Sequence, residues 1–213
     1  MEMPKLEFWF DFASTYSYLS AMRIERLGRD AGVDIAWRPF LLGPIFHAQG
    51  WPTSPFNVYP AKGRYMIRDM ERICRTRGLS FKMPAVFPTN GLAAARIALI
   101  GEADGWIAPF SKAVFEAGFA RGEDIGDAST LSKILASVCP EDQVSSVRAR
   151  SIEAANKEKL RLQGARAVEL GTFGAPSFVC ADGELFWGDD RLEEALVWAQ
   201  VLSTRIHQFA VFE

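Results

Sequence analysis

Residues 6–18 read LEFWFDFASTYSY, and this stretch decides the fold. Its first part predicts a β-strand over residues 6–12, because every second side chain is apolar: Leu6, Phe8, Phe10 and Phe12 alternate with Glu7, Trp9 and Asp11. From Ser17 to Ala31, small and apolar residues recur every three or four positions, which is typical of a helix with one packed face. Arg23, Arg26, Arg29 and Asp30 fall on its solvent side. The strand therefore turns directly into a helix.

Ser14 lies at the N-terminus of that predicted helix. Unpaired N–H groups and the positive end of the helix dipole favour an anion there, and a serine hydroxyl adds one directed donor. Serine is also among the commonest N-cap residues, and ordinary capping of a backbone N–H is the alternative role. The segment alone leaves both roles open.

The composition excludes several classes of protein. With 213 residues and 49% hydrophobic content, the chain can bury a sizeable core. A net charge of −2 from 24 basic and 26 acidic residues predicts neither a nucleic-acid nor a membrane-surface partner. The N-terminal residues lack a secretion pattern, and no apolar run approaches the ~20 residues of a membrane span, so we expect a cytoplasmic protein.

The cysteines and histidines predict no redox dithiol and no metal site. Cys74, Cys139 and Cys180 are far apart and odd in number, and Cys74 falls on an apolar helical stripe typical of a core residue. His47 and His207 stand alone, so each is interpreted as a surface or packing residue.

Farther along the chain, the pattern predicts an α/β fold with a helical insertion. A second strand over 33–40 is followed by a long connecting loop over 43–60, which prolines and glycines interrupt. Helical patterns then cover 66–74, 92–100, 106–117, 131–138 and a long charged segment, 141–166. Strands over 177–181 and 184–187 flank an Asp182-Gly183 turn, and a final helix follows.

We therefore predict two parts of the chain with different architecture. Residues 1–42 and 167–213 form a discontinuous α/β domain, and residues 43–166 form an inserted all-helical domain.

Four segments carry a resemblance to a known family: FDFASTYSY at 10–18, PAKGRYM at 60–66, FGAPSF at 173–178 and FWGDDR at 186–191. Over nearly its full length, the chain resembles the 2-hydroxychromene-2-carboxylate isomerases and their relatives, the kappa-class glutathione transferases, in the DsbA-like branch. The resemblance implies a thioredoxin-like fold with an inserted helical domain, glutathione as cofactor, a homodimer, and a role in the degradation of aromatic compounds.

The same resemblance implies roles for the residues around the thiol. Ser14 matches the catalytic serine that holds the glutathione sulfur as a thiolate, where other thiol-handling proteins of this layout carry a cysteine. Ala175-Pro176 matches the cis-proline turn whose backbone pairs with the cysteinyl part of glutathione, although an ordinary trans bond is the commoner X-Pro state. Thr15 departs from the family, since relatives commonly have proline after the serine.

Further matches imply contacts to the two ends of glutathione. The segment Gly188-Asp189-Asp190 opens the last helix, so its N–H groups suit the γ-glutamyl carboxylate and an aspartate suits the ammonium, with simple capping as the alternative. Lys62 suits the glycyl carboxylate, with a solvated surface lysine as the alternative. Either Thr53 or Asn57 matches a polar residue on glutathione, and the sequence does not choose between them.

The resemblance predicts an isomerase that acts on an intermediate such as 2-hydroxychromene-2-carboxylate by reversible thiolate addition to a conjugated enone. The aromatic residues Phe46, Trp51 and Phe56 line the acceptor site or only pack in the interior. A kappa-like glutathione transferase or peroxidase and a non-catalytic glutathione-binding module are the alternatives. The missing Cys-x-x-Cys pair argues against a dithiol oxidoreductase.

Overall fold

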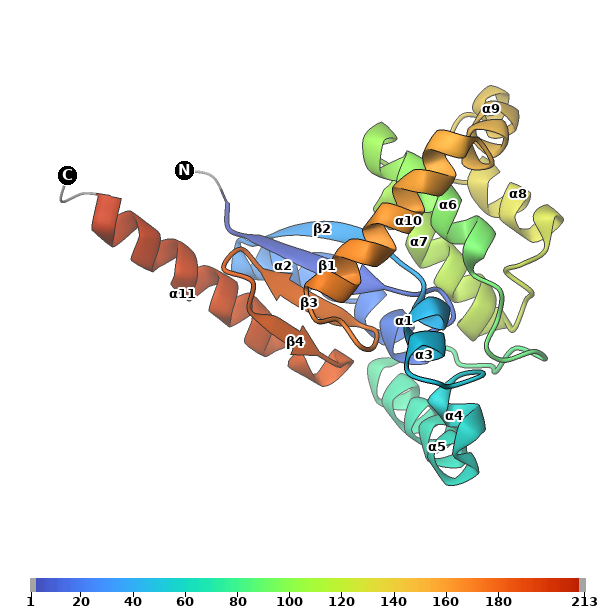
Figure 1. Cartoon of the computed structure of the whole chain (residues 1–213), viewed down its shortest axis with the longest axis horizontal. Coiled ribbons are helices and arrows are strands. Elements are labelled where there is room, and N and C mark those ends of the chain that lie inside the picture. The colour runs from blue at the N-terminus through green and yellow to red at the C-terminus, as the bar shows by residue number, and fades with distance from the viewer. Residues whose placement is uncertain (1–2, 211–213) are drawn as a thin grey trace.

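A central mixed sheet organises the molecule (Figure 1). The computed structural model describes residues 3–210, and side chains for residues 3–203. The strands lie in the order β2-β1-β3-β4, with β1 parallel to β2 and the other pairs antiparallel. Their bounds are β1 Lys5–Phe10, β2 Asp34–Pro39, β3 Ser177–Cys180 and β4 Leu185–Trp187. The predicted order of strands and helices is confirmed.

Helices occupy most of the remaining chain. Their bounds are α1 Thr15–Ala21, α2 Ile24–Ala31, α3 Leu42–Ala48, α4 Pro55–Val58, α5 Pro60–Arg77, α6 Leu92–Asp104, α7 Ile107–Phe115, α8 Ala128–Ala136, α9 Glu141–Ser151, α10 Ala154–Glu169 and α11 Leu192–Ala210, with a π-helix η1 Glu116–Arg121 and a 3₁₀ turn η2 Asp189–Arg191. Helices α6 to α9 gather at one end of the molecule (Figure 1). The predicted domain boundary at 166/167 falls within α10.

Three predicted elements were wrong in their extent. The helix expected up to Ala31 is two helices, because the chain turns at Met22-Arg23 and Arg23 pairs with Asp189. The expected loop over 43–60 contains α3 and α4, since Pro44 and Pro55 stand in the first turns of these helices, where a missing N–H costs nothing. The long helix expected over 141–166 ends at Ser151, whose carbonyl accepts from Asn156 Nδ2 at 3.2 Å.

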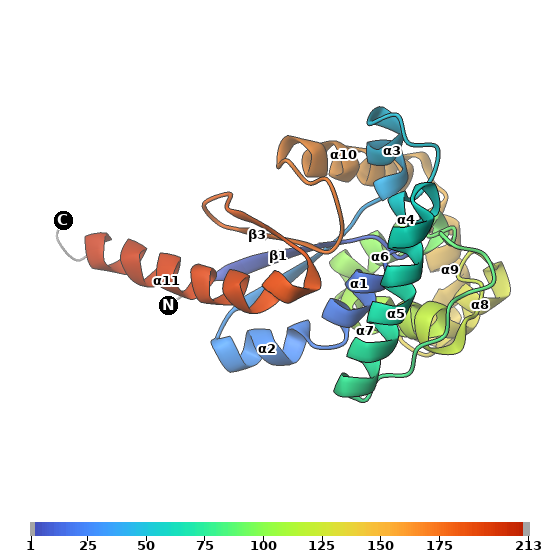
Figure 2. The ribbon, with the colours of Figure 1, turned by 90° about the horizontal axis from the view of Figure 1, so that it is seen from below.

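Both faces of β1 are buried. On one face, Phe8 stacks on Phe178 with ring centroids 5.7 Å apart, and α2 and α11 cover the layer (Figure 2). On the other face, Trp9 meets Phe40 at 6.0 Å beneath α3 and α10. Burial on both sides specifies the pairing register of β1, because a slip of one residue would exchange its two faces. The end of β1, where the candidate site begins, is therefore held in place.

Candidate functional site

The turn between β1 and α1 is organised by a buried carboxylate. Asp11 is 5% exposed; its Oδ1 accepts from the Ala13 N–H at 2.7 Å, and its Oδ2 accepts from the Leu42 N–H at 2.7 Å. Burial raises the pKa of Asp11, and these two hydrogen bonds oppose that rise. Asp11 thus ties the turn before Ser14 to the start of α3. No sequence pattern pointed to this role of Asp11.

Ser14 caps α1 and also reaches across the fold. Its Oγ accepts from the Ser17 N–H at 3.1 Å and donates to the Ala175 carbonyl at 2.8 Å. The Ala175-Pro176 bond is cis, as the resemblance implied. The expected N-cap is confirmed, and the two segments that the family pattern connects with the thiol lie in direct contact.

The loop after β4 closes onto the same turn. The Gly188 N–H donates to the Pro176 carbonyl at 3.0 Å, so the opening of the last helix is joined to the cis-proline segment. Gly188 has a φ of +110°, which favours glycine. At Gly174, an added Cβ would lie 2.3 Å from Nε1 of Trp187, so this close approach also requires glycine. Ser14, Ala175, Pro176 and Gly188 therefore form one connected cluster.

Asp189 is an anchor inside the protein. It is 4% exposed; its Oδ1 accepts from Ser20 Oγ at 2.9 Å and Arg23 Nε at 3.2 Å, and its Oδ2 accepts from Arg77 at 2.6 Å. Arg23 was expected on an exposed helix face, and this was wrong, because its side chain is 14% exposed and turned toward η2. Both Asp189 oxygens are thus occupied by the C-terminal parts of α1 and α5 and the start of α2.

Asp190 lies next to this anchor but faces solvent. Its side chain is 77% exposed, and its nearest cation, Arg191, is 3.8 Å away. Of the two aspartates, Asp190 is therefore the one whose carboxylate remains open to a ligand.

The remaining predicted residues lie on the segment before and within α5. Asn57 Nδ2 donates to Thr53 Oγ1 at 3.3 Å and to the Phe87 carbonyl at 2.9 Å, so these two candidates are brought together. Lys62 is exposed, with its Nζ 4.9 Å from the centre of the Tyr59 ring. The helix that carries Lys62 packs on α1, where the Tyr16 hydroxyl donates to Asp69 of α5 at 3.0 Å.

The cysteines supply no reactive sulfur. All three are buried and free. Burial raises the pKa of the Cys74 thiol to about 11 and that of Cys180 to about 12. Cys74 belongs to the main core, as predicted.

The described residues also contain no cluster of three or more histidines, cysteines or acids able to hold a metal ion. His47 is exposed, as expected, whereas the side chain of His207 lies outside the described residues. No helix within residues 3–210 has the length and apolar character needed to cross a membrane.

Comparison with known proteins identifies the family. Residues 5–196 match the DSBA-like thioredoxin domain. The chain is 30% identical to a 2-hydroxychromene-2-carboxylate isomerase of Pseudomonas putida, over 88% of this chain and 90% of that protein. A protein of the same name from Sphingobium xenophagum is 29% identical over 88% and 94% of the two chains. The chain belongs to the DSBA-like thioredoxin family. Within it, the chain is a member of the 2-hydroxychromene-2-carboxylate isomerase group.

Other similarities agree with this placement. A kappa 1 glutathione S-transferase of Caenorhabditis elegans is 29% identical over 40% of this chain and 38% of its own length. The solved structure of a 2-hydroxychromene-2-carboxylate isomerase has a TM-score of 0.79 at 23% identity and covers 98% of this chain and 99% of its own. A cytosolic disulfide reductase, DsbM of Pseudomonas aeruginosa with GSH, has a TM-score of 0.65 at 18% identity and covers 95% of this chain and 99% of its own. The predicted thioredoxin-like fold is confirmed.

We predict that Asp189→Asn destabilises the protein by about 2–3 kcal/mol, because Arg23 and Arg77 lose their shared charged acceptor. Urea unfolding followed by circular dichroism measures this change. Asp190→Asn is the matched control, and its exposed side chain predicts unchanged stability. Equal stability of the two variants would show that Asp189 is not an anchor.

We also predict that the native protein resists alkylation by iodoacetamide at pH 8, since a buried thiol with a pKa near 11 or 12 stays protonated there. Mass spectrometry should find the native thiols unmodified and the urea-unfolded thiols labelled. Rapid labelling of the folded chain at Cys74 or Cys180 would contradict the buried, protonated assignment.

Proposed function

We propose that this protein is a glutathione-dependent isomerase of the 2-hydroxychromene-2-carboxylate type. The proposal rests on the hydrogen bond from the Ser14 hydroxyl to the Ala175 carbonyl. This bond brings a hydroxyl donor next to an extended backbone segment, and a bound thiol peptide needs such a segment to pair with. Membership of an isomerase family supports the reaction class.

The groups around Ser14 fit glutathione. Ala175 makes no described hydrogen bond through its N–H, so this group is free to pair with a peptide backbone. The exposed carboxylate of Asp190 suits the γ-glutamyl ammonium, and Lys62, which has no acidic partner, suits the glycyl carboxylate. The side chains of Thr53 and Asn57 are hydrogen-bonded to each other, and together they offer one polar contact to glutathione.

Bound glutathione supplies a thiolate that adds reversibly to a conjugated enone, so that a double bond becomes rotatable and the thiol is recovered. The proposed role of Ser14 is to keep the sulfur of bound glutathione ionised. Its hydroxyl now donates to the Ala175 carbonyl, and a peptide N–H that replaces it on this carbonyl frees the hydroxyl to turn toward the sulfur. Ser14 then donates to the thiolate while still accepting from the Ser17 N–H.

We assign the acceptor side to α3, α4 and the loop between them. Phe46 and Trp51 pack at 5.6 Å between ring centroids, and Phe56 lies 6.4 Å from Tyr16 of α1. All three aromatic rings are half-buried, which suits contact with a flat apolar substrate.

A kappa-like glutathione transferase or peroxidase is the second candidate, favoured by the similarity to the kappa 1 enzyme. The two activities are separated by incubation with glutathione and either the chromene carboxylate or a chlorinated nitrobenzene. The isomerase gives a reversible absorbance change at constant glutathione, whereas the transferase consumes glutathione into a conjugate. If the protein binds glutathione but turns over neither compound, it is a non-catalytic glutathione-binding module.

We further propose that the protein is cytoplasmic and forms a homodimer. The three cysteines form no disulfide, which fits a reducing compartment in which glutathione is also present. Sedimentation of the purified chain tests the dimer.

Ser14→Ala is expected to lower turnover about 10²-fold or more with little change in glutathione affinity, because one preorganised donor to the sulfur is lost. The pKa of the bound thiol should rise, as read from thiolate absorbance in a pH titration. Ser14→Thr keeps a hydroxyl and the cap and should retain most activity, whereas Ser132→Ala on the exposed face of α8 controls for loss of a surface hydroxyl. An unchanged rate and thiol pKa in Ser14→Ala would remove Ser14 from the mechanism.

A further inference from the structure

Helix α5 concentrates positive charge on its exposed side. Six of the 24 basic residues of the chain and two of its 26 acidic residues lie on this helix, so α5 has a net charge of +4 in a chain whose net charge is −2. Four arginines recur at intervals of three or four positions and therefore share one exposed side of the helix. This basic stripe consists of Arg64, Arg68, Arg72 and Arg75 and is about 16 Å long.

Neighbouring acids do not neutralise this charge. Two members of the basic stripe pair with the two acids of the same helix. The other two, Arg64 and Arg75, form no ion pair or side-chain hydrogen bond in the part of the chain that the structure describes. Lys62 contacts the ring of Tyr59. Ion pairs within the helix leave its net charge unchanged, so the excess positive charge acts on the surrounding solution.

Hydrogen bonds at two points place α5 beside the cluster around Ser14. In the middle of the helix, Asp69 accepts at 3.0 Å from the hydroxyl of Tyr16, which lies two residues after Ser14. At the C-terminal end of the helix, Arg77 donates at 2.6 Å to Asp189, the residue after the last member of the cluster. The basic stripe therefore borders the approach to the candidate site.

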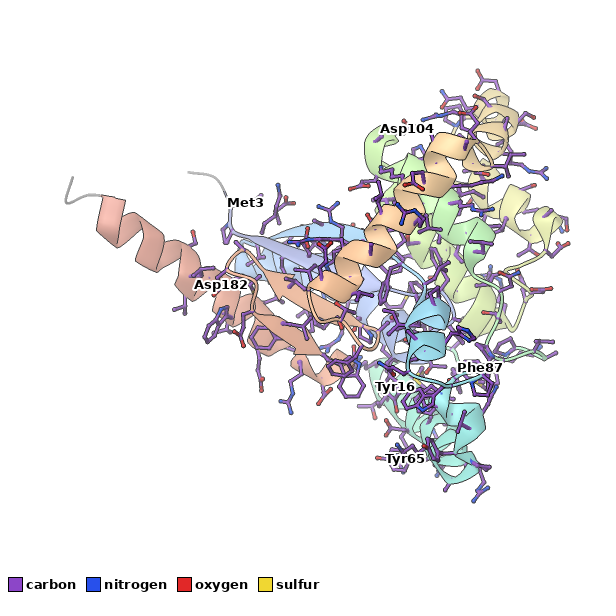
Figure 3. All side chains as sticks on the ribbon, in the orientation of Figure 1. Met3, Tyr16, Tyr65, Phe87, Asp104 and Asp182 are labelled. Carbon is purple, nitrogen blue, oxygen red and sulfur yellow. The ribbon has the colours of Figure 1, made fainter. Side chains whose placement is uncertain are left out.

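Negative charge gathers at the C-terminal end of α5. Residues 189–194 read DDRLEE, with four acids and one base, and Arg77 joins α5 to this acidic segment. The N-terminal half of α5, which carries Arg64, therefore lies farthest from these acids. Figure 3 shows Tyr65, from the same half, beyond Tyr16 of α1 at the outer end of the molecule. The positive potential is thus least opposed beside the N-terminal half of α5.

We propose that α5 steers an anionic thiol to Ser14, so that a thiol peptide of net negative charge is captured faster than a neutral thiol. This inference rests on the proposed function, because it names the charge class of the thiol in the same site. Glutathione belongs to this class, since it has one more carboxylate than ammonium groups. Charges along the approach to a site raise the association rate without touching the bound molecule, and salt weakens their effect.

The test is the rate at which glutathione associates with the purified protein, followed by stopped-flow tryptophan fluorescence. A triple variant, Arg64→Gln with Arg68→Gln and Arg75→Gln, should associate about ten-fold more slowly than the native protein at about 0.01 M salt, with an unchanged dissociation rate. At about 1 M salt, where the Debye length is about 3 Å, the two proteins should associate at equal rates. Glutathione ethyl ester, whose blocked glycyl carboxylate leaves no net charge, should associate with both proteins at one rate.

The matched control removes the same charge from α9 and α10, on the side of the molecule away from α5 (Figure 1). It combines Arg148→Gln, Lys157→Gln and Arg161→Gln, all at exposed positions. Like Arg68 in the α5 set, Arg161 pairs with an acid of its own helix. This control should change the association rate by less than about two-fold, because its charges lie farther from the site. Lysine in place of the three α5 arginines keeps the charge and should keep the native rate.

Equal association rates of glutathione with the native protein and the α5 glutamine variant at low salt would overturn the steering proposal, and so would an equal loss of rate for the ester. Circular dichroism checks the folding of each variant, and the single variants Arg64→Gln and Arg75→Gln disturb no ion pair.

Thiolate absorbance in the same samples separates steering from the proposed function. If the native protein ionises glutathione and the α5 variant captures it equally fast, the function stands and the steering is lost. If capture depends on α5 but no thiolate forms, the steering stands and the thiolate mechanism is lost. If the native protein does not bind glutathione, both are overturned.

Discussion

The antiparallel register of β1 and β3 is the constraint on which the site depends. Trp9 lies opposite Ser177, so the residues after β1 meet those before β3, and Ser14 reaches Ala175 across 161 positions of the sequence. Stacking of Phe8 on Phe178 secures this pairing, because a shift by one residue would turn those rings out of their shared layer. The packing of Phe8 on Phe178 thus fixes the position of the hydrogen bond between Ser14 and Ala175.

A second constraint is electrostatic and joins the opening of the last helix to the same centre. Asp189 gathers Ser20, Arg23 and Arg77 around one nearly enclosed carboxylate, so η2 is tied to both helices that border the site. Such a cluster is favourable only when each buried oxygen is satisfied, which is the case here. Gly188 and Asp190 are therefore held in place through their neighbour Asp189. The side chain of Asp190 takes no part in this cluster and stays exposed.

The sequence predicted those parts of the site that depend on interactions between residues close together in the chain. The alternation up to Phe12, the N-cap at Ser14 and the hairpin turn at Asp182-Gly183 follow from a few neighbouring residues, and the family pattern added the cis bond before Pro176. The role of Asp189 was missed because its partner Arg23 lies 166 positions away and Arg77 112 positions away.

In the proposed function a bound thiol takes the place of a protein cysteine, and the burial of the chain's own sulfurs fits that role. Burial keeps the thiols of Cys74 and Cys180 protonated. Asp11, the acid in the turn before Ser14, has both oxygens on backbone N–H groups. In the proposed reaction the sulfur therefore comes from the bound thiol, and Ser14 is the residue of the chain that stabilises its charge.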